Sequence, residues 1–128
     1  DDGSCGIHIV IRVMKEINDS GYKGTVVIKS TIIVGTTEKI IKNFPKLNIV
    51  YNPEFLTEAN SVYDFMHPHC IYLGGSKENC EKIKNLYDKL FNNFVPYYIS
   101  EDTSLIEMVK YTANSFLAVK CSVAFGYI

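Results

Sequence analysis

Residues 25–51, TVVIKSTIIVGTTEKIIKNFPKLNIVY, alternate between two kinds of hydrophobic pattern. Thr25–Ile28 is a short β-branched run, which is typical of a strand buried on both faces. Thr36–Phe44 carries apolar residues at helical spacing and is followed by Pro45, which ends a helix. Leu47–Tyr51 is apolar again and predicts a second strand. The stretch therefore predicts a strand, a helix and a strand in succession.

The same alternation continues on both sides of this stretch. Ahead of it, Ile7–Ile17 fits a helical stripe. Behind it we expect a short helix at Pro53–Ala59, a strand at Cys70–Leu73 stopped by two glycines, a helix capped by Ser76, and a strand at Val95–Ile99. Strands that alternate with helices indicate an α/β fold with a parallel sheet covered on both sides.

The pattern changes near the end of the sequence. A helical run extends from Ser104 to about Phe125 and is longer than the connecting helices. Ser104 and Glu107 have the spacing of a capping box at its head. Its second half, Ser115–Ile128, is apolar apart from one lysine and is shorter than the ~20 residues of a membrane span, so we expect a buried helix.

Composition narrows the class of protein. With 128 residues and 47% hydrophobic content, the chain is long enough for one domain with a modest core. Its formal net charge of -1 makes nucleic acid and membrane surfaces poor partners. The sequence opens without a signal-like segment and resembles the interior of a longer sequence, so we expect a cytoplasmic protein.

The cysteines and histidines do not form a recognisable framework. The four cysteines have no C-x-x-C spacing and predict reduced, mostly buried thiols. His67, His69 and Cys70 lie too close together in the chain to converge on one ion, and no second cluster completes a tetrahedral set. We therefore expect no metal site.

Two acidic residues, Glu54 and Glu58, follow the second predicted strand. Asn52 suits the N-cap and Pro53 the first position of a helix, which would place both carboxylates on one face. Ligands bind beyond the carboxyl ends of strands in open α/β sheets, so general acid and base work is one interpretation. Solvated acids that complement the dipole at a helix start explain the same pattern.

Lys110 and Asn114 are four residues apart on the long helix, among apolar neighbours. Both can donate hydrogen bonds to one oxyanion or sugar hydroxyl. The alternative is a lysine that snorkels past the helix edge beside an exposed asparagine. A third candidate lies between a predicted strand, which ends at Lys29–Thr31, and a predicted helix, which begins at Gly35–Thr37. The hydroxyl and backbone N–H groups of these residues can hold a phosphate or a nicotinamide amide. Alternatively, they simply cap the helix.

Together these segments resemble the UDP-glucose and GDP-mannose dehydrogenase family. The matching stretches occur in the family's order and spacing and span nearly all of residues 25–120: VIKST through VGTT at 27–37, NPEFLTE at 52–58, YDF with a proline and a glycine at 63–74, and EMVKYTANSFLA at 107–118. The resemblance implies the second half of a Rossmann-like NAD-binding domain with a parallel sheet at residues 1–101. It implies the start of a long central helix and dimerisation domain at residues 102–128.

The resemblance also implies an activity and a set of roles. The activity is NAD-dependent, two-step oxidation of a sugar C6 alcohol to a carboxylate through a cysteine thioester, as from UDP-glucose to UDP-glucuronate in a homodimeric protein. Glu54 resembles the general base that activates a water, and Thr31 and Glu58 resemble positions on the nicotinamide side of the site. Lys110 and Asn114 resemble the pair that stabilises negative charge on the reacting oxygen. The substrate-binding residues implied are Glu54, Phe55, Leu56, Thr57, Glu58, Lys110 and Asn114.

Departures from the family pattern limit what the chain alone can do. Ile33 replaces a proline, Ala59 replaces a glycine, and His69-Cys70 replaces an Asp-Arg pair, which removes a bidentate donor. No G-x-G-x-x-G fingerprint occurs, and no cysteine lies in the family's Gly-x-Cys-Phe-Pro-Lys context; Cys121, in an apolar helix, is a poor substitute. We expect an internal fragment that is inactive alone. The alternatives are a GDP-mannose or other UDP-sugar dehydrogenase, and a catalytically silent packing module.

Overall fold

The computed structural model describes residues 6–91 and 95–126 and has an α/β fold. Its helices are α1 (His8–Asp19), α2 (Thr36–Asn43), α3 (Ser61–Met66), α4 (Lys77–Leu90) and α5 (Thr103–Ala124), with one turn of 3-10 helix, η1 (Glu58–Asn60). Its strands are β1 (Thr25–Ile28), β2 (Asn48–Tyr51), β3 (Ile71–Gly75) and β4 (Tyr97–Ser100). The predicted fold class is confirmed, and so is Ser76 as the cap of α4, where its side chain accepts from the Asn79 N–H.

The four strands form one sheet in the order β1-β2-β3-β4. The β1–β2 and β3–β4 pairs are parallel, but β2 and β3 are antiparallel, so the sheet is mixed. An antiparallel neighbour needs no crossover, and the chain between β2 and β3 therefore stays at the carboxyl end of β2.

The two glycines that were predicted to stop β3 instead form its last two residues, so this prediction is wrong. They pair with β2: Val50 lies opposite Gly75 and Tyr51 opposite Gly74. Gly75 has a φ of +152°, and a Cβ there would lie 2.9 Å from the Ile49 carbonyl oxygen. Glycine is therefore required for the two strands to approach this closely.

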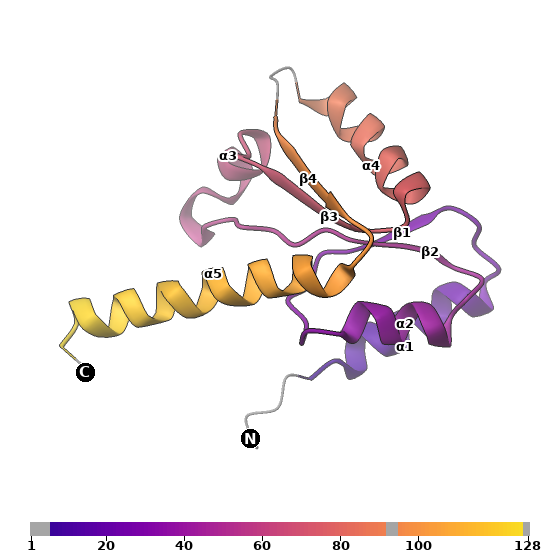
Figure 1. The fold of residues 1–128 in the computed structure, drawn as a ribbon, viewed down its shortest axis with the longest axis horizontal. Coiled ribbons are helices and arrows are strands. Elements are labelled where there is room, and N and C mark those ends of the chain that lie inside the picture. The colour runs from indigo at the N-terminus through magenta and orange to yellow at the C-terminus, as the bar shows by residue number, and fades with distance from the viewer. Residues whose placement is uncertain (1–5, 92–94, 127–128) are drawn as a thin grey trace.

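Helices cover both faces of the sheet (Figure 1). On one face, α1, α2 and α5 contribute buried Met14, Ile40 and Ile106 to a core with alternate residues of β1 and β2. On the other face, α4 contributes Cys80 and Ile83 to a second core. The central strands β2 and β3 are thus buried on both sides, whereas β1 is buried at alternate positions and β4 has no fully buried residue.

The predicted helix at Pro53–Ala59 is wrong. Residues 52–57 have no regular secondary structure, and helical geometry begins only at Glu58. Thr57 is extended, and both its N–H and its hydroxyl donate to the Asp64 carboxylate, at 2.8 and 2.6 Å. Asn52 is not an N-cap, because its buried side chain is bonded elsewhere. Glu54 and Glu58 therefore do not share a helical face.

Two predictions about the long helix are also wrong. Asp102, not Ser104, is the N-cap of α5 and accepts a hydrogen bond from the Ser104 N–H at 3.0 Å, so no capping box forms. The second half of α5 is exposed, with Phe116 at 62% and Val123 at 63%, because the helix extends beyond the sheet (Figure 1). Within the described residues, no helix combines the length and apolar character that crossing a membrane requires.

Candidate active site

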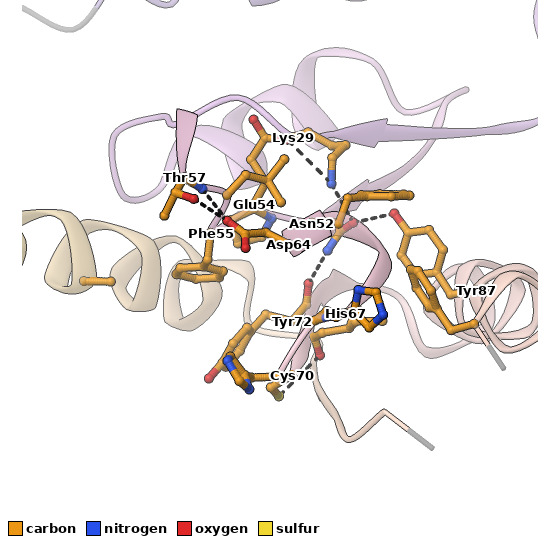
Figure 2. Close-up of a pocket in the computed structure, with 18 of the residues that line it drawn as sticks. Lys29, Asn52, Glu54, Phe55, Thr57, Asp64, His67, Cys70, Tyr72 and Tyr87 are labelled. Carbon is orange, nitrogen blue, oxygen red and sulfur yellow. Dashed lines mark hydrogen bonds and ion pairs between the residues drawn. The ribbon is translucent and has the colours of Figure 1, made fainter. Parts of the chain in front are cut away.

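A cavity of about 640 Å³ opens at the carboxyl ends of β1 and β2 (Figure 2). This end of an open α/β sheet is where ligands usually bind. Its wall is the irregular segment 52–57, completed by Lys29 just after β1 and by side chains from β3, α3, α4 and α5. Its lining residues include Lys29, Asn52, Glu54, Phe55, Leu56, Thr57, Tyr72, Tyr87 and Val109. The cavity is therefore built around residues 52–57 of the NPEFLTE motif.

Asn52 connects three parts of this wall. Its Oδ1 accepts hydrogen bonds from the Tyr87 hydroxyl at 2.7 Å and from Lys29 Nζ at 3.3 Å. Its amide nitrogen donates to the Tyr72 carbonyl at 2.9 Å. Figure 2 shows Asn52 between these partners, which come from α4, the end of β1, and β3. Its side chain thus holds the start of the motif in one position.

Glu54 contacts two lysines that come from distant parts of the chain, one through its side chain and the other through its backbone. Its Oε2 lies 4.0 Å from Lys29 Nζ, and its backbone carbonyl accepts a hydrogen bond from Lys110 Nζ at 2.6 Å. Burial lowers the pKa of Lys29 and of Lys110 below the ordinary lysine value, and the nearby charge of Glu54 partly offsets this. The cavity rim therefore holds a carboxylate beside two ammonium groups that release a proton more readily than exposed lysines.

Phe55 joins the motif to α5 and to the sheet. The Lys110 ammonium lies 5.0 Å from the centroid of the Phe55 ring, a cation–π distance. The same ring packs against Tyr72 with centroids 5.4 Å apart. The hydrogen bond from the Thr57 hydroxyl lowers the pKa of Asp64 most, and the bond from the Thr57 N–H lowers it further. These two bonds hold the far end of the segment 52–57 in place.

The structure brings together only some of the residues predicted for the site. Glu54, Phe55, Leu56 and Thr57 line the cavity, and Lys110 contacts two of them. The predicted residues that do not line it are half-buried Lys110 and the exposed Thr31, Glu58 and Asn114.

Sequence reasoning missed the contribution of Asn52 and Tyr87 to the cavity. The signal for Asn52 was its place directly after an apolar strand, which was interpreted as a helix cap. Tyr87 has helical spacing with apolar Ile83 and Leu90 in the sequence, which indicates a packing role, although its hydroxyl bonds to Asn52.

The histidines and cysteines of the described residues contact protein groups or solvent and form no metal-binding cluster with one another. The His67 ring stacks on Tyr63 with centroids 4.2 Å apart, and the described part of the chain contains no group of three metal-ligating side chains. The described cysteines are free thiols: Cys80 is buried, which raises its pKa to about 11, and Cys70 is half-buried. Cys121 is exposed, contrary to the expected burial, and Cys5 lies outside the described residues.

Residues 1–95 match the family model for the "UDP-glucose/GDP-mannose dehydrogenase family, NAD binding domain". The chain is also similar to a UDP-glucose 6-dehydrogenase of Campylobacter jejuni, with 34% identity over 111 residues. That match covers 85% of this chain and 28% of that protein.

Two solved structures are similar to this fold. One is a UDP-glucose dehydrogenase from the archaeon Pyrobaculum islandicum, with a TM-score of 0.77, 29% identity, and coverage of 96% of this chain and 30% of that one. The other is a GDP-mannose dehydrogenase from Pseudomonas aeruginosa, with a TM-score of 0.81, 24% identity, and coverage of 97% and 31%; this likeness concerns the fold alone. The chain therefore spans less than a third of each of these relatives.

Proposed function

Because the chain belongs to the UDP-glucose/GDP-mannose dehydrogenase family, we propose that it carries part of the active site of an NAD-dependent nucleotide-sugar dehydrogenase. The supporting observation is the 2.6 Å hydrogen bond from the Lys110 ammonium to the Glu54 carbonyl. This bond joins the two motifs on which the family resemblance depends, at the rim of a cavity large enough for a small molecule.

The proposed reaction converts a sugar C6 alcohol to a carboxylate. It consumes one water and two NAD, and yields two NADH and three protons. Lys110 has three N–H donors, of which one is bonded to Glu54, and the others serve to stabilise the alkoxide that forms when the C6 hydroxyl loses its proton. Asn114, one turn further along α5, is proposed to donate to the same oxygen. The lowered pKa of Lys110 suits this role, because a more acidic ammonium is a stronger hydrogen-bond donor.

Glu54 is proposed to act in the second half of the reaction. Its exposed carboxylate is free of any backbone hydrogen bond among the described residues, so it can accept a proton from the water that attacks a thioester. The cysteine that forms this thioester lies outside these 128 residues in our proposal, because none of the four cysteines has the family's glycine-rich context. The segment Glu54–Thr57, with Glu58 beside it, is proposed as the sugar-binding wall.

The residues present fit one side of an NAD site. The Thr31 hydroxyl is exposed in the loop after β1, at the carboxyl end of the sheet, and we propose that Thr31 and Glu58 line the nicotinamide side. The sequence has no G-x-G-x-x-G, so the pyrophosphate side is proposed to lie outside this chain. When bound, NAD would accept a hydride from the sugar carbon.

Three wider proposals follow from the same premise. Residues 1–101 are proposed as the C-terminal part of the NAD-binding domain, and residues 102–128 as the start of a central dimerisation helix. The exposed apolar side chains along α5, among them Phe116 and Leu117, support burial against further protein, including a homodimer partner. A cytoplasmic location is proposed because the described cysteines are free thiols, as is usual in reducing compartments.

The test uses the complete polypeptide that contains these residues. Lys110→Ala should slow steady-state NADH formation with UDP-glucose about 100-fold or more. Glu54→Gln should allow a burst of NADH equal to twice the enzyme concentration and then slow turnover, because thioester forms but is not hydrolysed. The exposed controls Lys15→Ala and Glu81→Gln should be unaffected. Near-normal rates in both site variants would refute the assigned roles.

Two alternatives are decided by related measurements. A faster rate with GDP-mannose than with UDP-glucose would move the protein to the other branch of the family. A catalytically silent packing module is favoured by one observation, the long exposed apolar face of α5. Calorimetric titration of the 128-residue chain with NAD and with UDP-glucose distinguishes it, since binding comparable to that of an intact enzyme would exclude the silent alternative.

A further inference from the structure

Glu107 is a fully buried acidic residue that the proposed mechanism does not use. It lies near the start of α5, on the face of the helix that packs toward α2. Acidic side chains are almost never fully buried unless they are paired. The partners of Glu107 therefore indicate what it does.

Both carboxylate oxygens of Glu107 accept hydrogen bonds from the beginning of α2, which lies beside the first turns of α5 (Figure 1). Oε2 accepts from the Gly35 N–H at 2.5 Å. Oε1 accepts from the N–H and the hydroxyl of Thr37, at 2.7 and 2.6 Å. One backbone donor on each oxygen requires an acceptor on each, which a carboxylate provides and an amide does not.

Glu107 takes the place of a cap that α2 lacks in its own sequence. The first N–H groups of a helix have no partner within it and are usually capped by a neighbouring side chain. The N-cap of α2 is Gly35, which has no side chain and a φ of +86°. A negative charge at this position also interacts favourably with the helix dipole. The helix is thus capped by a carboxylate from α5.

This cap joins the two elements that carry opposite sides of the site. The Thr31 loop, residues 29–35, ends at Gly35, which is bonded to Glu107. Lys110 follows Glu107 on α5 after about one turn, and its ammonium is bonded to Glu54. Resting on the proposed function, we propose that Glu107 is a positioning residue that fixes the Thr31 loop to α5, so that the cofactor side and the substrate side keep one relative position.

The proposal predicts how a single-atom change acts. Glu107→Gln keeps the size of the side chain but turns an NH₂ group toward a backbone N–H, so one of the two attachments is lost. A displacement of about 1 Å between reacting groups can slow a reaction up to 100-fold. The wall at residues 54–57 is not bonded to Glu107 and should still bind the nucleotide sugar. We expect kcat to fall 10- to 100-fold while KM for the sugar changes less than about threefold.

The test compares variants of the complete polypeptide below their unfolding temperatures. Glu107→Asp, which keeps the charge but is shorter, should recover part of the loss in kcat. Glu38→Gln is the matched control, because it removes an exposed carboxylate from the first turn of the same helix and should leave kcat unchanged. Amide hydrogen exchange at Gly35 and Thr37 should accelerate at least tenfold in Glu107→Gln and not in the control.

The outcomes separate this proposal from the proposed function. Wild-type kcat and unchanged exchange in Glu107→Gln would refute the positioning role, as would a lowered unfolding temperature with normal kcat. If Glu107→Gln does not fold, Thr37→Val, which removes only the hydroxyl donor, should lower kcat severalfold, and an unchanged kcat would overturn the proposal. A wild-type protein that forms no NADH would refute the proposed function, and exchange at Gly35 and Thr37 would then decide whether the attachment exists.

Discussion

Replacing Asn52 with alanine should destabilise the fold more than its position in a loop suggests. Its side chain makes three hydrogen bonds to three separate elements, and the residue is 4% exposed, so water cannot replace them. Each such bond contributes about 0.5 to 1.5 kcal/mol, and its loss leaves a partly buried partner unpaired. Together they predict a loss of about 2 to 4 kcal/mol in the free energy of unfolding.

Equilibrium urea unfolding of the chain, followed by circular dichroism, measures this loss directly. Asn85→Ala is the matched control, since Asn85 is exposed on α4 and its substitution should change stability by less than about 0.5 kcal/mol. A change of that small size for Asn52→Ala as well would refute the inference that Asn52 holds the cavity wall together.

Three further predictions concern single positions. Gly35→Ala should lower the free energy of unfolding in urea by about 1 to 2 kcal/mol, because Gly35 has a φ of +86°. A Cβ at this position would meet no atom within 4 Å, so the loss can come only from the backbone conformation, and an unchanged stability would contradict this reasoning. Because burial lowers the pKa of Lys110, turnover that needs its charged form should decline on the alkaline side at a pH below 10.5, and Lys110→Arg should shift that decline upward in a pH–rate profile. An unshifted decline would assign it to another group. A thiol reagent should modify exposed Cys121 before Cys80, whose pKa is raised to about 11, and the reverse order would contradict the burial described.

Local pattern was sufficient for most of the fold. The strands and helices between Thr25 and Tyr51 were predictable because hydrophobic spacing reflects which faces are buried. The helix predicted at Pro53–Ala59 does not form, although Asn52 and Pro53 fit the local pattern of a helix start. Hydrogen bonds between Asn52 and residues that lie 20 and 35 positions away hold this segment in another conformation. The antiparallel β2–β3 pair was likewise invisible, since a short apolar run does not specify its direction.

The site was predictable only in part. No periodicity brings Glu54 and Lys110 together across 56 positions; their joint selection depended on a family resemblance, and the structure places them in contact. Glu107 was interpreted as part of a capping box, because its spacing from Ser104 fits one, whereas tertiary packing turns it toward α2. The catalytic and binding roles of all the predicted site residues, Glu54 and Lys110 included, stay predictions.

The most direct test of the central claim is the stoichiometry of the reaction. Oxidation of an alcohol to a carboxylate removes four electrons, and each NAD accepts two, so the complete polypeptide should form two NADH for each UDP-glucose consumed. The nucleotide product should be the corresponding carboxylate, identified by mass spectrometry. One NADH per sugar, with an aldehyde product, or no NADH with any nucleotide sugar, would contradict the account.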